Sequence, residues 1–387
     1  MKAKFKIQNI FKGDAAIWFI FFVLSVISLI SVFSSIGLYA IADNHTTPMH
    51  LFVKHAAFVA ASYVAIIAIT PLKTNLLYKL ANWVFLFSGV LVFLALMQHT
   101  RWIGILGIRF QPSEVVKLGI TLFMARMLQN HRDELDSPKF FGFLLAVTAL
   151  VAIAIFPENF STAALIFLAC LFAMLFAGVN LRNWLYAFGA IAVIGLLMLL
   201  FFYKFGDSLE AFRSSTWSHR IEAWLHPIDP SAPNPQLTQE AMAKMAIASG
   251  GFWGHGIGNT VHARLMTQAH NDFIFAIIIE ELGAVGGIII FALYTVFFRR
   301  CIKIVKKCRD LFSATIVAGF GTIIYFQALV NMSVAVGLLP VTGQTLPFVS
   351  YGGTAYLILS CGIGMIQCVA YNIKKQEKND ETEEYTE

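Results

Sequence analysis

Long apolar runs recur along the whole chain and are separated by short polar segments. Each run holds roughly 20 residues, which is the length that a helix needs to cross the hydrocarbon core of a bilayer. Ten such spans are predicted, at residues 15–40, 51–70, 76–98, 113–129, 140–156, 161–178, 183–203, 272–298, 313–337 and 354–373. The pattern therefore predicts an all-α, polytopic integral membrane protein with one transmembrane domain over residues 15–373.

The composition supports this prediction and excludes several classes of protein. Hydrophobic residues make up 58% of the chain and charged residues only 13%, with a mean hydropathy of +0.71, whereas soluble domains carry about 25% charged residues. The five cysteines form no CxxC pair and no cluster with histidine, so neither a disulfide framework nor a zinc site is predicted. Membrane topology explains the net charge of +6 better than binding of nucleic acid does.

Lysine and arginine set the predicted orientation, because cytoplasmic segments of membrane proteins are enriched in these residues. Most of the 28 lysines and arginines fall on one side when the N-terminal segment 1–14 is placed in the cytoplasm. An even number of spans puts the charged tail 374–387 on the same side, where its composition favours disorder. The one long hydrophilic loop, residues 204–271, then lies outside, and its part 239–248 has a helix-forming composition.

The residues around the start of the eighth span suggest chemistry. A glycine-rich stretch, Gly250–Gly258, precedes the polar tetrad Gln268–Asn271, and Asp272 then opens the apolar run. A carboxylate between water and hydrocarbon is costly unless it is paired or used in function. The alternative is that Asp272 only caps the helix, since aspartate is a favourable N-cap residue. Two further acids, Glu280 and Glu281, follow two turns later and could pair with a loop.

Charged residues also gather between the third and fourth spans, at the same outer face. Arg101 and Arg109 lie in the connecting segment, and Glu114 and Lys117 lie at the start of the next span. Glu114 and Lys117 are three residues apart and share one face of the predicted helix. They could contact a substrate or form an ion pair that locks helices together. The two arginines could likewise bind a substrate or anchor the chain at lipid headgroups.

The segment between the ninth and tenth spans, residues 337–354, has no charged side chain and many glycines and prolines. Such a composition favours a re-entrant segment buried in protein over a solvated loop. It contains Ser350. The long outer loop adds His219 and Arg220 to the polar residues predicted on this face.

The order of these motifs resembles that of a known family. They are Gln111-Pro112-Ser113-Glu114 with Lys117, Ala248-Ser249-Gly250-Gly251, Gly254-x-Gly256-x-Gly258, Asp272-Phe273-Ile274-Phe275, Glu280-Glu281-Leu282-Gly283, Gly337-Leu338-Leu339-Pro340-Val341-Thr342-Gly343 and Leu346-Pro347-Phe348-Val349-Ser350-Tyr351-Gly352-Gly353. Together they resemble the SEDS family, the bacterial peptidoglycan polymerases of the FtsW and RodA type. The resemblance covers the first to the last span, and His219-Arg220 followed by Trp224 looks more like FtsW than RodA.

Two departures from the family pattern stand out. Family members usually have Pro-Asp-x-Gly-Thr where this chain has Pro157-Glu158-Asn159-Phe160-Ser161-Thr162, so Asn159 replaces an acid. The usual Leu-Pro-Glu before the catalytic stretch is Met266-Thr267-Gln268. Glu158 lies next to Asn159, and the roles that the family gives to its own acids at these two places are not carried over to Asn159 and Gln268.

The resemblance implies a glycosyltransferase that polymerises lipid II, an undecaprenyl-pyrophosphate disaccharide-pentapeptide, into glycan strands. It places the reaction at the outer face of the bacterial cytoplasmic membrane during cell division. A class B penicillin-binding transpeptidase and other division proteins are the implied partners, beside membrane lipids and with no nucleic acid.

The implied chemistry assigns roles to the outer-face residues. Asp272 suits the general base that accepts the hydroxyl proton, because partial burial raises the pKa of a carboxylate toward the operating pH. The cations Arg101, Arg109, Lys117 and Arg220 suit the pyrophosphate, and Glu114, His219 and Ser350 complete the predicted substrate site. A divalent cation, Mg²⁺ or Mn²⁺, could share the pyrophosphate near Glu114 or Asp272, although no metal motif demands one.

Two other classes of function remain open from the residues alone. Ten spans with intramembrane charges also suit a flippase or transporter of lipid II, and a third interpretation is a non-catalytic division scaffold. Alternating-access transporters bind their substrates near the midplane of the membrane, whereas the polar clusters here lie at one face. A scaffold has no evident need to gather glycine turns, cations and an acid at one depth.

Overall fold

The computed structural model describes residues 11–42, 48–98, 100, 102–105, 108–156, 159–180, 182–185, 224, 239–262, 266 and 271–384. The elements in chain order are α1 (Ala15–Ala42), α2 (Pro48–Ile69), α3 (Thr74–Met97), β1 (Ile103–Ile105), β2 (Ile108–Phe110), α4 (Pro112–Asn130), the 3₁₀ turn η2 (Arg132–Glu134), α5 (Pro138–Ile155), α6 (Phe160–Phe176), α9 (Gln239–Gly250), α10 (Ile274–Val305), α11 (Leu311–Ala335) and α12 (Thr354–Glu384). Most of the predicted span 183–203, much of the loop 204–271 and most of segment 1–14 lie outside the described residues.

The predicted polytopic helical fold is confirmed. Every predicted span that falls within the described residues coincides with one helix. Seven of the described helices are long and apolar enough to cross a membrane, and α6 is a shorter apolar helix. The fourth predicted span forms α4, whose apolar character is reduced by three charged side chains at Glu114, Lys117 and Arg126. The helix predicted within the long loop is α9.

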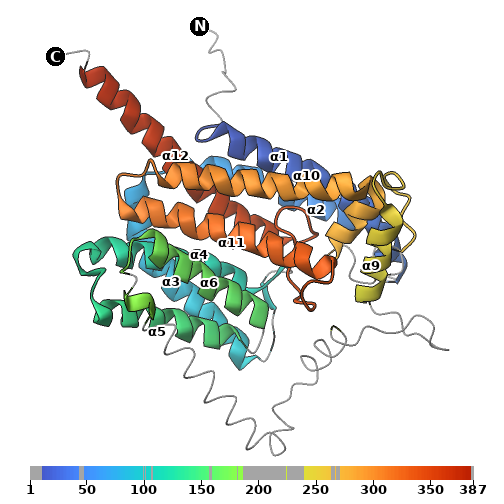
Figure 1. The fold of residues 1–387 in the computed structure, drawn as a ribbon, viewed down its shortest axis with the longest axis horizontal. Helices are drawn as coiled ribbons and strands as arrows, with labels where there is room; N and C mark the ends of the chain where they lie inside the picture. Colours follow the sequence, from blue (N-terminus) through green and yellow to red (C-terminus); the bar gives the residue numbers. More distant parts are fainter. Residues whose placement is uncertain are drawn as a thin grey trace, which may run out of the picture.

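Helix α11 occupies the middle of the bundle. It packs against α10 on one side and against α4 and α6 on the other, while α12 packs on α2 and α3 packs on α4 (Figure 1). A large apolar core joins α1, α2, α10, α11 and α12, and a smaller one lies among α4, α5 and α6. Of the membrane-spanning windows, 72% of α11 is buried but only 28% of α3 and of α5, so the central helices make most of their contacts within the protein.

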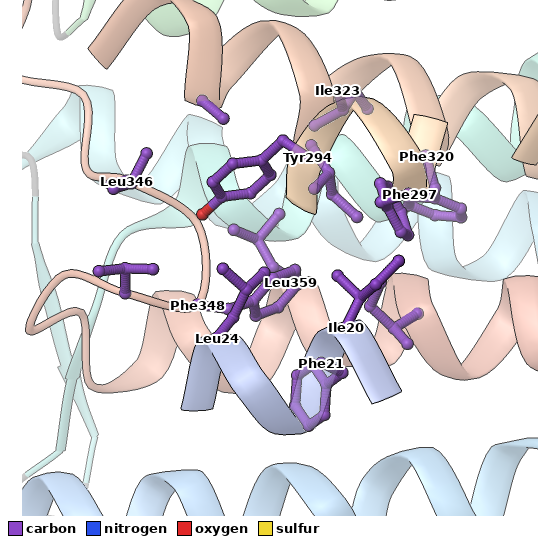
Figure 2. Close-up of a cluster of buried hydrophobic side chains, with 14 of the residues drawn as sticks. Ile20, Phe21, Leu24, Tyr294, Phe297, Phe320, Ile323, Leu346, Phe348 and Leu359 are labelled. Carbon is purple, nitrogen blue, oxygen red and sulfur yellow. The ribbon is translucent and has the colours of Figure 1, made fainter. Parts of the chain in front are cut away.

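The middle of the uncharged segment 337–353, residues 346–350, is buried in the large core, as its composition predicted, whereas Leu338 and Leu339 near its start are exposed. Tyr294 of α10 is fully buried and donates its hydroxyl hydrogen to the Pro347 carbonyl, and Figure 2 shows its ring beside Leu346 and Phe348. Phe348 is the one non-glycine residue with a positive φ, 61°, among the described residues. That strained conformation is held by ring contacts to Phe21 at 5.2 Å and Tyr356 at 5.5 Å.

The start of α1 contacts α12 at the opposite end of the bundle. Asp14 caps α1 by accepting hydrogen bonds from the backbone nitrogens of Ala16 and Ile17 at 2.9 and 3.1 Å. Gln367 of α12 accepts from the Asp14 backbone nitrogen at 2.6 Å and donates to the Asp14 carbonyl at 3.0 Å. One glutamine side chain therefore forms hydrogen bonds with both backbone groups of a residue 353 positions away.

The predicted disorder of the tail 374–387 is wrong for most of its length, because α12 continues to Glu384. The tail contains no glycine or proline, and its lysines, glutamates and glutamine favour helix. Two ion pairs connect it to residues that follow the α10 helix. Lys307 lies 3.1 Å from Glu377, and Arg309 pairs with Asp380.

Candidate active site

A cavity of about 730 Å³ lies at the end of the bundle where α4, α6 and α12 begin. Its wall consists of Lys54, Phe58, Trp102, Arg109, Gln111, Glu114, Asn159, Thr162, Asn271, Asp272, Gly343, Gln344, Thr345, Tyr351, Gly352, Gly353, Thr354 and Ala355. Two carboxylates, Glu114 and Asp272, and two cations, Lys54 and Arg109, therefore share one space. This combination suits a substrate that carries both a negative charge and a proton to be removed.

Asp272 is held at the cavity wall through its main chain. Asn331 of α11 donates to the Asp272 carbonyl at 2.8 Å and to the Gln344 carbonyl at 2.7 Å. A Cβ added to Gly343 would lie 3.9 Å from Asp272 Oδ2, so the carboxylate faces the uncharged segment. Helix α10 begins at Ile274 with Phe273 at its N-cap, which gives no support to the interpretation of Asp272 as the cap.

The glycine-rich stretch, called the glycine loop here (residues 250–258), docks on a break in α10. The break is at Gly283, with φ 70° and ψ −172°. Backbone nitrogens of His255 and Gly256 donate to the carbonyls of Glu280 and Glu281 at 3.0 and 2.9 Å. These bonds satisfy carbonyl groups that the interrupted helix would leave without partners.

Glycine is required where the glycine loop touches the break. A Cβ on Gly283 would lie 2.1 Å from the Phe252 carbonyl oxygen, and one on Gly254 would lie 2.2 Å from the Glu281 carbonyl oxygen. Both residues also have positive φ values, 70° and 77°, which other residues rarely adopt. The motifs 250–258 and 280–283 are thus two halves of one main-chain contact.

The two acids of that contact pair with the loop, which is the structural interpretation considered from the sequence. Glu280 accepts from the backbone nitrogens of Val261 and His262 at 3.0 and 2.9 Å, and from His262 Nδ1 at 3.1 Å. Glu281 accepts from the Gly258 nitrogen at 3.0 Å and from the Ser34 hydroxyl. Neither acid lines the cavity.

Glu114 and Lys117 form an ion pair, which was one of the two interpretations that the sequence left open. Lys117 Nζ lies 2.7 Å from Glu114 Oε1 and donates to Gln327 Oε1 at 2.9 Å, and Gln327 donates to the Thr345 carbonyl at 3.0 Å. Glu114 lines the cavity, whereas Lys117 is fully buried behind it. The structure therefore places Lys117 as the counter-ion of a cavity acid rather than on the wall where the substrate would lie.

Of the other predicted cations, the structure describes Arg109 but not Arg101 or Arg220. Arg109 lies on a β1–β2 hairpin in which it is paired with Gly104, and Thr354 donates to its carbonyl at 3.1 Å. The hairpin thus fixes Arg109 beside the start of α12. Arg101, His219 and Arg220 lie outside the described residues. Trp224 of the same long loop donates its ring nitrogen to the Gly337 carbonyl at 3.0 Å.

Ser350 and Asn159 hold main chain at the site. Ser350 is 2% exposed and does not line the wall; it accepts from the Leu346 nitrogen at 2.8 Å and donates to the Asn271 carbonyl at 2.6 Å. Asn159 caps α6 by accepting from the Thr162 nitrogen at 3.1 Å. Asparagine caps a helix about as well as aspartate, so the departure from the family pattern preserves this cap.

Lys54 and Gln344 are among the polar wall residues that sequence reasoning did not assign to the site. Lys54 lies on α2 among apolar residues, and its position inside a predicted span was the available signal. Gln344 was hidden in a segment of uncharged residues. It donates to the Thr162 hydroxyl at 2.6 Å and to Asn159 Oδ1 at 3.4 Å, which joins the uncharged segment to α6.

The wall offers limited coordination for a divalent cation. The described residues contain no group of three or more histidine, cysteine, aspartate or glutamate side chains placed to hold a metal ion. Glu114 Oε2 is buried without a hydrogen-bond partner among them. Mg²⁺ usually takes one or two carboxylates together with phosphate oxygens, so Glu114 and Asp272 fit a metal that the substrate would help to hold.

Comparison with known proteins identifies relatives over most of the chain. The family of cell cycle proteins that comprises FtsW, RodA and SpoVE matches residues 14–375. A probable peptidoglycan glycosyltransferase FtsW of Geobacter sp. (strain M18) is 31% identical over 279 residues, which cover 71% of this chain and 72% of the relative. The protein of the same description from Coxiella burnetii (strain RSA 493 / Nine Mile phase I) is 31% identical over 341 residues, 84% of this chain and 87% of the relative.

Solved structures share the fold. One is a chain of a peptidoglycan synthase complex studied for the coordination of polymerization and crosslinking, with a TM-score of 0.73, 22% identity and coverage of 93% of this chain and 98% of that one. Another is the rod shape determining protein RodA of Thermus thermophilus, with a TM-score of 0.63, 20% identity and coverage of 94% and 98%.

Proposed function

The chain belongs to the FtsW, RodA and SpoVE family of cell cycle proteins, and we propose that it polymerises lipid II with Asp272 as the general base. It is a multi-pass membrane protein and a peptidoglycan glycosyltransferase, like the relatives that bear that name. One observation carries the assignment of the residues. The Asp272 carboxylate shares a cavity of about 730 Å³ with Lys54 and Arg109, so a base and anion-binding groups are close together.

The reaction joins two sugar units and releases a lipid pyrophosphate. The 4-hydroxyl oxygen of the acceptor bonds to the anomeric carbon of the donor while the bond from that carbon to the pyrophosphate oxygen breaks. Asp272 takes the hydroxyl proton, and the undecaprenyl pyrophosphate leaves with the electron pair of the broken bond. General-base catalysis of this kind contributes about 10²- to 10⁴-fold to the rate.

Arg109 and Lys54 are the described cations that would stabilise the departing pyrophosphate. The guanidinium group of arginine matches two phosphate oxygens at once, whereas lysine acts as a point charge. Lys117 acts indirectly by keeping Glu114 paired. Arg101, Arg220 and His219 remain predicted substrate contacts in the undescribed part of the outer face. A divalent cation held by Glu114, Asp272 and the substrate would supply further charge stabilisation.

The proposed setting is the bacterial cytoplasmic membrane, with the cavity at the outer face and both termini in the cytoplasm. The asymmetry of lysine and arginine supports this orientation. Glycan strands need crosslinking, so a class B penicillin-binding transpeptidase is the proposed partner, and the likeness to FtsW proteins supports a role in septal synthesis.

Purified protein incubated with labelled lipid II tests the proposal. Wild-type protein should form glycan strands, and Asp272→Asn should lower the rate by about 10²- to 10⁴-fold while expression and unfolding temperature stay unchanged. Asp310→Asn is the matched control, because Asp310 caps α11 through the Ser313 nitrogen at 2.7 Å, and asparagine caps as well.

Three other results would contradict the proposal. An Asp272→Asn rate above roughly a tenth of wild type is too high for loss of a general base and would assign the base to Glu114, the other carboxylate of the wall. Transbilayer movement of lipid II without polymer would favour a flippase. A protein that shows neither polymerisation nor translocation, alone or with a transpeptidase, would favour a scaffold.

A further inference from the structure

A second cavity, of about 310 Å³, lies between α1, α10 and α12. Its wall consists of Asp14, Ala15, Arg300, Lys303, Ile304, Lys307, Ala370, Ile373, Lys374 and Glu377. Along α12 it begins sixteen residues after Thr354 of the first cavity, about 24 Å of helix. The two cavities therefore open at opposite ends of the bundle, and this one is at the end where the first and last helices of the chain meet.

Cations outnumber acids in this second cavity. Its four cations are Arg300, Lys303, Lys307 and Lys374, and its two acids are Asp14 and Glu377. Both acids already have partners, because Arg300 lies 2.5 Å from Asp14 and Lys307 lies 3.1 Å from Glu377. The wall keeps an excess of two positive charges after these pairs are counted.

Part of the donor capacity of the cations is unused. Lys303 has no ion pair among the described residues, and Arg300 Nε is buried without a hydrogen-bond partner among them. Lys374 donates to the Gly13 carbonyl at 2.7 Å, which leaves its positive charge without a carboxylate. A buried unpaired donor is costly, so an anion that accepts from Arg300 would remove that cost.

The remaining wall is apolar. Ala15, Ile304, Ala370 and Ile373 lie among the charged residues. Arg300 and Lys303 share one face of α10, and Lys307 follows that helix. A soluble anion would use only the charged part of such a wall. An amphipathic molecule with an anionic head and an apolar body would use both parts.

We propose that this cavity binds the headgroup phosphate of an anionic phospholipid from the leaflet on the side of the chain termini. The phosphate would lie among Arg300, Lys303 and Lys374, and the glycerol and upper acyl chains would lie against Ile304 and Ile373. Basic pockets between transmembrane helices on the cytoplasmic side recognise anionic headgroups in this way. The lipid would brace α1, α10 and α12 against one another.

Native mass spectrometry of the full chain tests the preference for an anionic lipid directly. The protein is released from detergent that contains equal amounts of phosphatidylglycerol and phosphatidylcholine with the same acyl chains. Phosphatidylglycerol should be retained and phosphatidylcholine should not. Inorganic phosphate at millimolar concentration should fail to displace the lipid. Equal retention of the two lipids, or displacement by phosphate alone, would overturn the proposal, and neither measurement depends on glycosyltransferase activity.

Paired variants locate the site. Lys303→Gln with Lys374→Gln removes two cations of the wall, whereas Lys306→Gln with Lys375→Gln removes two neighbouring cations that do not line it. Each cation near the membrane surface contributes about fivefold in affinity, so the first pair should weaken retention about 30-fold. The second pair should leave it nearly unchanged. An equal loss in both pairs would mean that only net charge matters and would reject the site.

Discussion

Two irregular segments contact residues 271–285, and they are held in different ways. The glycine loop is fixed by main-chain contacts to the α10 break at Gly283. The uncharged segment 337–353 is fixed by side chains, since Ser28 donates to the Val349 carbonyl at 2.9 Å and Asn331 donates to the Gln344 carbonyl at 2.7 Å. Irregular backbone at membrane depth needs such partners, because lipid offers none.

The glycine loop therefore serves as structural support, whereas the uncharged segment forms part of the cavity wall. The backbone of the glycine loop forms hydrogen bonds with α10. The side chains of Phe252 and Trp253 remain 59% and 78% exposed. The uncharged segment is held from behind by side chains, so its residues Gly343–Thr345 and Tyr351–Gly353 can line the cavity. Substitutions in the first segment should therefore act on folding, and substitutions in the supports of the second should act on the cavity.

The largest effect is expected for Gly283→Ala. The added Cβ would lie 2.1 Å from the Phe252 carbonyl oxygen, at a φ of 70°, so the glycine loop must move away from α10. A loss of about 4 kcal/mol or more of unfolding free energy is expected, seen as loss of folded protein in detergent. Gly258→Ala is the control, because its φ is 82° but no atom lies within 4 Å of the added Cβ; it should cost about 1–2 kcal/mol. Equal losses would show that backbone strain, rather than the close contact, matters at both positions.

Lys117→Met should have the next largest effect. It leaves Glu114 buried without its counter-ion, and breaking such a pair costs about 3–5 kcal/mol. It also removes the donor to Gln327, whose amide supports Thr345. Thermal unfolding and lipid II polymerisation should both fall. Adding Glu114→Gln should restore much of the stability but not the activity, and a single variant as stable as wild type would contradict the pairing.

Asn331→Ala should have an intermediate effect. It removes the donor shared by the carbonyls of Asp272 and Gln344, and each buried group left without a partner costs about 1–3 kcal/mol. Polymerisation should fall more than the unfolding temperature does, because the loss lies beside the base. Asn331→Asp keeps the side-chain shape without the N–H donor and should lose activity as Asn331→Ala does. Wild-type activity in Asn331→Asp would show that the activity depends on packing at this position and not on hydrogen-bond donation.

The smallest effect is expected for Tyr294→Phe, which removes the hydrogen bond to Pro347 and keeps the ring in the core. The expected loss is about 1 kcal/mol of unfolding free energy, with little change in polymerisation rate. Tyr325→Phe serves as the comparison, since Tyr325 stacks on Phe298 at 4.6 Å and should be neutral. A large loss of activity in Tyr294→Phe would mean that the Pro347 contact sets the cavity shape.

The fold was predictable because crossing a bilayer imposes a length and an apolar composition on every helix. The exception is the tail after Lys374, where composition alone favoured disorder but α12 continues to Glu384. Its helix is supported by ion pairs with Lys307 and Arg309. Those partners come from a distant part of the chain, so no local pattern could reveal them.

The candidate site was predictable only in part. Asp272, Glu114 and Arg109 line the cavity as expected, because a charge in or beside an apolar run has few reasons to be there. Ser350 and Lys117 are buried and do not line the cavity, whereas Lys54 and Gln344 belong to its wall without an obvious motif. Which side of a helix or loop faces a cavity depends on packing between distant segments.

The contact between Asp14 and Gln367 also constrains the timing of assembly. At the start of α1, the Asp14 backbone nitrogen donates to a side chain made 353 residues later, and the same side chain donates to the Asp14 carbonyl. At roughly 5–20 residues per second of synthesis, that delay is roughly 20 to 70 seconds. Helix α1 therefore gains this contact only after those residues have been made. A chain that stops before Gln367 would contain every residue of the active-site cavity and still lack the side chain that makes this contact.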